Sequence, residues 1–315
     1  MNFRLLCRGS LLLGFASLLS ACLSAPQSAA LVQQTDSQLL EPVSISSLPF
    51  FSQSAYQCGP AALATMLVHS EVTVSPDDLV PLVYVPERKG SFQFEMVAAT
   101  RSYERLAYQL APTLNAVLDE VRAGHPVLVL QNLGLSWYPR WHFAVVKGFD
   151  LGRQKIILNS GTFENYEMSL TTFELTWARA QYWAMLALEP GRMPSNAEPN
   201  AYYIALASLE ETHPQADIVS GYRSGLRAWP TDQNLLMGYG NLLYQAGNKA
   251  EAATQFREVI AYHSAYAPAW NNLAQILLDS GDRVEARANV LQAIELGGPF
   301  IETYRATLMK IDAAE

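Results

Sequence analysis

The apolar positions along the chain predict three regions of different structure. Between residues 58 and 124 they recur at helical spacing, and Gly124 ends the last of these helices. Between residues 126 and 188 they form short runs typical of buried strands, with one short helix opening at Thr171. Beyond residue 200 the pattern is helical again. The helices of the first part are predicted to begin at Cys58, Ser75, Ser91 and Thr113, and its strands to cover residues 126–130, 142–146, 155–158 and 182–188.

The carboxyl-terminal helices repeat with a period of 34 residues. Gly247 and Gly281 are one period apart, as are Glu251 and Glu285. This is the period of the tetratricopeptide repeat, in which each unit is a pair of helices. We expect units at residues 233–266 and 267–300, a degraded unit at 199–232 and a capping helix at 301–313. Such arrays bind proteins or peptides, and the alternatives are a rigid spacer or a dimerisation element.

The amino terminus has the pattern of an export signal. Arg4 and Arg8 precede an apolar run at residues 11–19 that is too short to span a bilayer. The run ends in Leu19-Ser20-Ala21-Cys22, which resembles the cleavage box of bacterial lipoproteins. The resemblance implies cleavage before Cys22 and acylation of its sulfur, whereas a plain secretory signal is the alternative. Since Leu23 is not acidic, the resemblance implies the cell envelope, at the periplasmic face of the outer membrane.

The domain boundaries follow from these patterns. We expect a signal peptide at 1–21, a flexible tether at 22–42, an α+β domain at 43–190, a linker at 191–199 and a repeat domain at 200–315. Half of the residues are hydrophobic and 16% are charged, which is typical of globular proteins. The formal net charge of −8 argues against nucleic acid as a partner.

Cysteine usage singles out one thiol for chemistry. Cys7 leaves with the signal peptide and Cys22 is the predicted acylation site, so only Cys58 remains as a free thiol. Gly59 and Pro60 follow it and precede strong helix formers, so Cys58 lies at or just before a helix N-terminus. The partial positive charge there favours a thiolate. The alternative is a buried structural cysteine.

His142 begins an apolar strand, and an imidazole is a common general base. A turn and a returning strand follow, and they end at Asn159. An amide at that place accepts an imidazole N–H and fixes the tautomer, and Asp150 in the turn is a weaker candidate for this role. The aromatic residues just before His142 either line a substrate groove or pack over the sheet edge.

The sequence Gln53…Cys58-Gly59-Pro60 resembles the double-glycine peptidase domain of bacteriocin exporters, a small papain-like cysteine peptidase. The resemblance implies Cys58 as nucleophile and Gln53 as oxyanion donor. In that family the catalytic histidine begins one strand and its orienting residue lies near the end of the next, which are the places of His142 and Asn159. That family usually has aspartate there, so Asn159 is a departure from it. The cleavage of a peptide or protein substrate, without cofactor or metal, is therefore expected.

Two other functions stay open from the sequence. One is a peptide-binding lipoprotein that has the fold but no activity, and the other is a Cys-His acyltransferase or deamidase. Metal chemistry is disfavoured because the sequence contains neither CxxC nor HExxH.

The lipoprotein prediction is tested by replacing the acylated residue. We expect Cys22→Ser to move the protein from the membrane fraction to the soluble fraction, since no thiol is left to carry the lipid. Cell fractionation with immunodetection measures this. A Cys22→Ser protein that is processed as before and stays wholly membrane-bound would contradict the prediction.

Overall fold

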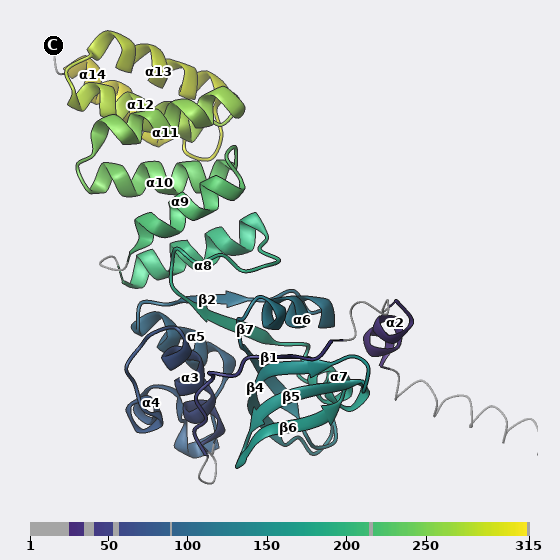
Figure 1. The fold of residues 1–315 in the computed structure, drawn as a ribbon. Helices are drawn as coiled ribbons and strands as arrows, with labels where there is room; N and C mark the ends of the chain where they lie inside the picture. Colours follow the sequence, from purple (N-terminus) through teal and green to yellow (C-terminus); the bar gives the residue numbers. More distant parts are fainter. Residues whose placement is uncertain (1–24, 35–40, 53–56, 89, 214–216, 314–315) are drawn as a thin grey trace, which may run out of the picture. The chain divides into compact units, whose positions relative to one another are not determined.

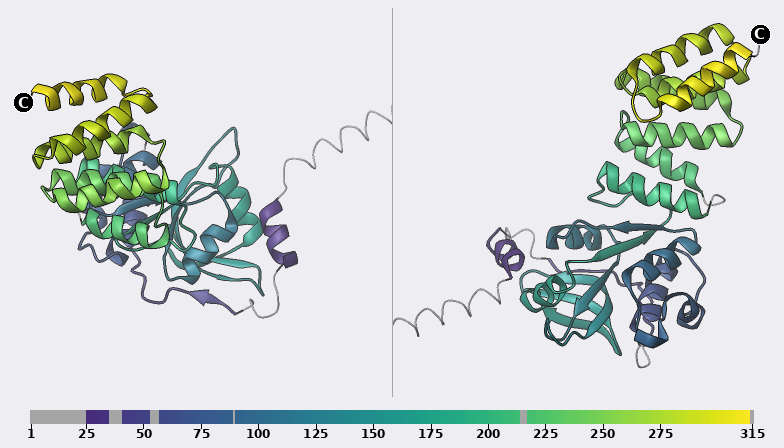
Figure 2. Two further views of the ribbon diagram at one scale, coloured as in Figure 1. Left: turned by 90° about the horizontal axis from the view of Figure 1, so that it is seen from above. Right: turned by 180° about the vertical axis from the view of Figure 1, so that it is seen from behind.

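The structure is a computed structural model that describes residues 25–34, 41–52, 57–88, 90–213 and 217–313. Within these ranges the chain forms two compact units. The first runs to Leu188 and also includes Pro194–Asn196, and the second contains residues 189–193 and the chain from Ala197 onward. The first unit combines helices with a sheet, and the second is built of helices (Figures 1 and 2).

The sheet of the first unit is antiparallel throughout its pairings. Its strands follow the order β2-β7-β3-β4-β5-β6, and β1 pairs with β4. The strands are β1 (Val43–Ser44), β2 (Leu106–Gln109), β3 (Val127–Asn132), β4 (Trp141–Asp150), β5 (Lys155–Ser160), β6 (Phe163–Ser169) and β7 (Ala184–Leu188). The helices are α2 (Pro26–Gln34), α3 (Cys58–His69), α4 (Pro76–Val83), α5 (Gln93–Ser102), α6 (Leu114–Arg122) and α7 (Leu170–Ala178), with a 3₁₀ turn η3 (Pro86–Arg88).

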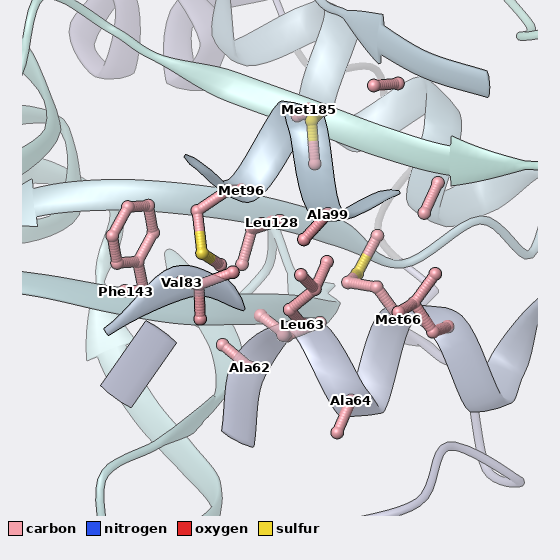
Figure 3. Packing of buried hydrophobic residues seen from close by; sticks show 14 of the residues in the cluster. Ala62, Leu63, Ala64, Met66, Val83, Met96, Ala99, Leu128, Phe143 and Met185 are labelled. Atoms are coloured by element: carbon pink, nitrogen blue, oxygen red, sulfur yellow. The ribbon is translucent and has the colours of Figure 1, made fainter. Parts of the chain in front are cut away.

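Helix α3 lies at the centre of the hydrophobic core. Every residue from Gly59 to Leu67 is buried, so the helix has no solvent face along most of its length. Apolar residues of α4, α5, β3, β4 and β7 surround it, and Figure 3 shows Leu63 and Met66 among them. A helix that is apolar on all sides is stable only inside a core. The position of its first residue is therefore set by packing over its whole length.

Local capping accounts for the accuracy of the predicted helix starts. Ser75 and Asp78 form a capping box at the start of α4, and the Thr113 hydroxyl accepts a hydrogen bond from the third residue beyond it. After α6, Gly124 adopts a positive φ of 86°, which suits glycine at a helix end. These are the residues on which the sequence predictions rested.

Strands β1, β2 and β6 were not predicted. β6 is the clearest case, because most of its residues are exposed and it has no buried apolar run. It forms the edge of the sheet, where one side is paired with β5 and where both faces of the strand reach solvent. The apolar pattern on which strand prediction depends is therefore absent there.

Helix α2 corrects the expectation of a flexible tether over residues 22–42. The carboxylate of Glu174 in α7 accepts hydrogen bonds from the backbone N–H groups of Gln27 (2.9 Å) and Ser28 (2.6 Å). It also accepts one from the Ser28 hydroxyl (2.6 Å), and both Glu174 and Ser28 are buried. The Gln27 side chain bonds the Leu114 N–H and the Pro112 carbonyl. Residues 26–34 are thus a docked helix, and the buried carboxylate lies at its positive end.

The second unit consists of antiparallel helix pairs with the predicted period. Its helices are α8 (Pro199–Thr212), α9 (Ile218–Ala228), α10 (Gln233–Gln245), α11 (Lys249–Tyr262), α12 (Ala267–Asp279), α13 (Arg283–Leu296) and α14 (Ile301–Ala313). Helices α10 and α12 begin 34 residues apart, as do α11 and α13. Gly247 and Gly281 occupy the same turn in successive pairs, with φ of 82° and 86°. The repeat and the capping helix are therefore formed as predicted.

Candidate active site

Cys58 is the first residue of α3, at the amino end of the buried helix. Gln57 precedes the helix, and its carbonyl accepts the first helical hydrogen bond from Ala61 N at 3.3 Å. Gly59 allows the close approach of the segment that precedes α5, because a Cβ atom there would lie 2.2 Å from the Ser91 hydroxyl. The sequence Cys-Gly therefore places a half-buried thiol at a helix N-terminus against a close-packed neighbour.

The beginning of strand β4 lies next to this end of α3. The backbone N–H of Phe143 is directed at the Cys58 sulfur, and the Gly59 and Cys58 N–H groups also interact with it. Because Phe143 directly follows His142, the sulfur lies beside the beginning of β4. The contact between the α3 N-terminus and this strand therefore places Cys58 beside the residue that follows His142.

The imidazole of His142 is held by a serine. Its Nε2 lies 2.9 Å from Ser160 Oγ at the end of β5. If Nε2 carries the proton and donates it to this oxygen, Nδ1 keeps the lone pair that a general base needs. Ser160 was not among the predicted site residues.

Asn159 occupies the predicted segment but makes other contacts. Its Nδ2 donates to the Pro49 carbonyl at 3.4 Å, and its Oδ1 accepts from Asn165 N at 3.4 Å. The expected hydrogen bond to His142 is not among these contacts, and Ser160 supplies the bond instead.

A β-bulge explains the exchange of Asn159 for Ser160. The hairpin turn pairs Asp150 with Lys155. If the strands stayed in this register, Asn159 would lie opposite Val146, on the sheet face that carries His142. The register shifts by one residue directly after Val146, so Asn159 pairs with Val145 instead. Side chains alternate along a strand, and Ser160 therefore shares the face of His142. A turn sequence predicts the initial register, but it carries no signal for a bulge several residues away.

The pKa values of Cys58 and His142 do not favour the thiolate that the sequence predicts. Burial raises the pKa of the Cys58 thiol, and it outweighs the opposing effect of the backbone N–H groups of Phe143, Gly59 and Cys58. Burial and the charge of Arg140 lower the pKa of His142 to about 4. Near neutral pH the resting pair is thus a thiol and a neutral imidazole. The expected thiolate is not favoured, because desolvation exceeds the stabilisation that the helix N-terminus provides.

The aromatic residues before His142 do not pack over the sheet edge. The exposed fraction is 81% for Trp137, 69% for Tyr138 and 54% for Trp141. Their loop is nevertheless held firmly: the Oδ1 of buried Asn132 accepts hydrogen bonds from Gly134 N and Arg140 N, both at 2.9 Å. Of the two expectations, the covering loop is wrong, and an aromatic surface beside the candidate site remains.

A second aromatic pair lies on the other side of His142. Phe163 pairs with Ser160 across the β5–β6 hairpin and is 63% exposed. Its ring centroid is 5.9 Å from that of Tyr166. Exposed aromatic residues thus occur both next to His142 on β4 and on β6, which pairs with the strand that carries Ser160. The sequence showed Phe163 as an isolated aromatic residue, because strand β6 itself was missed.

The other candidates are outside the site or outside the described residues. Gln53 and Cys22 fall in parts of the chain that the structure does not describe. Asp150 lies at the opposite end of β4 from His142, where it accepts a hydrogen bond from Arg153 N at 2.9 Å. His125, another histidine of the first unit, pairs with buried Glu120, and its Nδ1 lies 2.7 Å from the Glu120 Oε2.

Two features are absent from the residues that the structure describes, a metal centre and a membrane-spanning helix. Over these ranges, no group of three or more His, Cys, Asp or Glu side chains is arranged to hold a metal ion. In the same ranges, none of the helices combines the length and apolar character needed to cross a bilayer.

Comparisons with known proteins agree with the fold of the first unit. Residues 45–185 match the model of a family described as "Peptidase_C39 like family". This match and the paired helices of the second unit confirm the predicted fold class, a papain-like α+β domain followed by a helical-repeat solenoid. No curated protein shows a significant match to the chain.

Several solved structures resemble parts of the chain. A protein described as a C39-like peptidase from Bacillus anthracis is 16% identical, with 47% of this chain and 98% of that chain covered and a TM-score of 0.42. The Yersinia enterocolitica type III secretion chaperone SycD, in complex with a peptide of the translocator YopD, is 16% identical over 36% of this chain and 92% of its own, with a TM-score of 0.34. PcrH from Pseudomonas aeruginosa is 15% identical over 38% and 96%, with a TM-score of 0.36.

The pKa of Cys58 can be measured by alkylation. We expect the rate of reaction with iodoacetamide to keep rising above pH 8.5, the usual pKa of a free cysteine, because burial disfavours the thiolate. His142→Ala should leave the inflection nearly unchanged, since a neutral imidazole does not stabilise the thiolate. An inflection below pH 7 that moves upward in His142→Ala would instead establish an ion pair.

Proposed function

We propose that the first unit is a cysteine peptidase in which Cys58 is the nucleophile and His142 is the general base. The observation that carries the proposal is the Phe143 N–H directed at the Cys58 sulfur, because it brings the thiol to the residue next to His142. The family match over residues 45–185 supports the same assignment.

The reaction starts from the neutral pair. His142 takes the thiol proton as the sulfur attacks a peptide carbonyl, so charge separates only while the new bond forms. The imidazolium then gives its proton to the leaving amine, and water hydrolyses the thioester. The Cys58 backbone N–H, at the N-terminus of α3, and the amide of Gln53 are proposed to stabilise the oxyanion.

Ser160 is the proposed positioning residue for His142. Its Oγ accepts the Nε2 proton and thereby selects the tautomer in which Nδ1 is free to act as the base. A hydroxyl stabilises imidazolium less than a carboxylate does, which is consistent with the low pKa of His142. The exposed aromatic surface formed by Trp137, Tyr138 and Trp141 is proposed to contact the substrate.

The proposed setting is the cell envelope. Acylation of Cys22 anchors the chain at the periplasmic face of the outer membrane, and the helical repeats of the second unit bind a protein or peptide partner. Both statements rest on the sequence patterns and on the helix pairs of residues 199–313.

A peptide-binding protein without activity is the second candidate. It is favoured by the electrostatics of the pair: among the described residues, no carboxylate contributes to the pKa shift of His142, and the thiol is stabilised in its protonated form. Such a protein would retain the aromatic surface and the fold but would not turn over substrate.

Covalent labelling separates these two candidates. We expect a peptide carrying a carbonyl electrophile to label Cys58 in the intact protein, and Cys58→Ala and His142→Ala to abolish turnover of a peptide library. Mass spectrometry locates the label. Labelling that is no faster than that of a free cysteine, together with absent turnover and retained peptide binding, would favour the second candidate.

The positioning role distinguishes two adjacent residues. We expect Ser160→Ala to lower kcat about tenfold, the loss that corresponds to one hydrogen bond, with KM unchanged. The acid limb of the kcat/KM profile should lie near pH 4 in the wild type, because His142 must be neutral to act as a base. Asn159→Ala is the matched control and should leave both kcat and the pH of this limb nearly unchanged. The opposite result would return the role to Asn159.

The oxyanion donor is tested with a second matched pair. Gln57 directly precedes Cys58, and adjacent side chains of an extended segment point to opposite sides, so Gln53 is the expected donor. We expect Gln53→Ala to lower kcat by about 10²–10³ with little change in KM. Gln57→Ala should behave nearly as the wild type. A large loss in Gln57→Ala alone would transfer the role to that residue.

A further inference from the structure

The docked helix α2 limits how far the first unit can stand from its anchor. Cys22, the acylation site of the proposed function, precedes Ala25 by three residues. A fully extended chain of that length spans at most about 11 Å. The Ala25 carbonyl accepts the first hydrogen bond of α2, from Ala29 N at 3.1 Å. Wherever residues 22–24 lie, the lipid attachment point is therefore within this distance of the body of the unit.

The attachment of α2 is strong because a buried carboxylate makes it. Glu174 is fully buried and receives three hydrogen bonds from Gln27 and Ser28. Undocking α2 would break all three of these hydrogen bonds, and hydrogen bonds to a charged group are stronger than those between neutral groups. The side chain of Gln27 adds two bonds, to Pro112 and Leu114 at the start of α6. The segment after the anchor is thus attached to two helices of the unit.

The exposed residues of helices α2 and α7 carry no charge. Helices α2 and α7 contain one charged residue between them, Glu174, and it is buried. The chain as a whole has 16% charged residues and a net charge of −8. A neutral surface avoids the repulsion that other faces of an acidic protein meet near anionic lipids. Figures 1 and 2 show that α2 and α7 lie on one side of the first unit and α4 on the opposite side.

We propose that the side of the first unit formed by α2 and α7 rests on the lipid surface, with Glu174 fixing this orientation through α2. The proposal rests on the lipid anchor at Cys22 that belongs to the proposed function. In place of a unit that rotates freely on a long tether, the anchor and the docked helix hold one side toward the bilayer. The partner is a phospholipid membrane, and the contact is peripheral.

The test compares two exposed positions on opposite sides of the unit. The mature lipid-anchored chain with Cys58→Ser is placed on vesicles of phosphatidylethanolamine and phosphatidylglycerol. Thr171→Cys on α7 and Leu82→Cys on α4, both exposed, are labelled in separate samples with the same fluorophore. Lipids with a spin label on the headgroup quench probes near the surface. We expect several-fold stronger quenching at position 171 than at position 82.

Two variants show whether the docked helix causes the difference. Glu174→Ala removes the acceptor of the three hydrogen bonds and should make quenching equal at the two positions, and circular dichroism checks that the variant is folded. Inserting about twenty Gly and Ser residues between Leu23 and Ser24, with an r.m.s. span of roughly 25 Å, should do the same without touching the folded unit.

Each outcome decides a separate point. Equal quenching in the unaltered, vesicle-bound chain would overturn the orientation and leave the anchor intact. A difference that persists in Glu174→Ala and in the long-linker chain would overturn the role of α2. Failure to bind vesicles at all would overturn the anchor itself, and the orientation with it.

Discussion

The burial of α3 on all sides is the constraint on which the candidate site depends. Leu63, Ala64 and Leu67 have no exposed surface, so the helix cannot slide or rotate without opening the core. Its first residue is consequently fixed against β4, with the Cys58 sulfur at the Phe143 N–H. The same packing that fixes the thiol also removes it from water, so the position and the protonation state of Cys58 have one cause.

That shared cause explains why the expected thiolate is not favoured although Cys58 does begin a helix as predicted. A helix N-terminus carries about half an elementary charge and stabilises a nearby anion by at most about 2 kcal/mol. Here the thiol and the imidazole are both largely buried, and each loses hydration in its charged form. The sequence shows that Cys58 begins a helix, but it does not show how deeply the beginning of that helix is buried.

The accuracy of the sequence predictions follows the range of the interactions involved. Helix starts at Ser75 and Thr113 depend on bonds between residues three apart, and the 34-residue repeat depends on neighbouring helices, so both were predictable. Helix α2 depends on hydrogen bonds to a distant part of the chain, and the edge strand β6, although it pairs with its sequence neighbour β5, is mostly exposed and carries no buried apolar pattern. The replacement of Asn159 by Ser160 beside His142 arises from a bulge in β4, which shifts every later residue of the hairpin partner by one.

The exposed loop that carries Trp137 and Tyr138 has a consequence for the behaviour of the protein in solution. Asn132 orders the loop before any ligand arrives, so binding there loses little conformational entropy. The same order keeps the aromatic rings exposed to other copies of the chain. The net charge of −8 opposes such encounters over a range of about 10 Å at 0.1 M ionic strength. Salt screens the electrostatic repulsion between the molecules, whereas the attraction between aromatic surfaces remains. The colloidal stability of the protein therefore falls as the salt concentration rises.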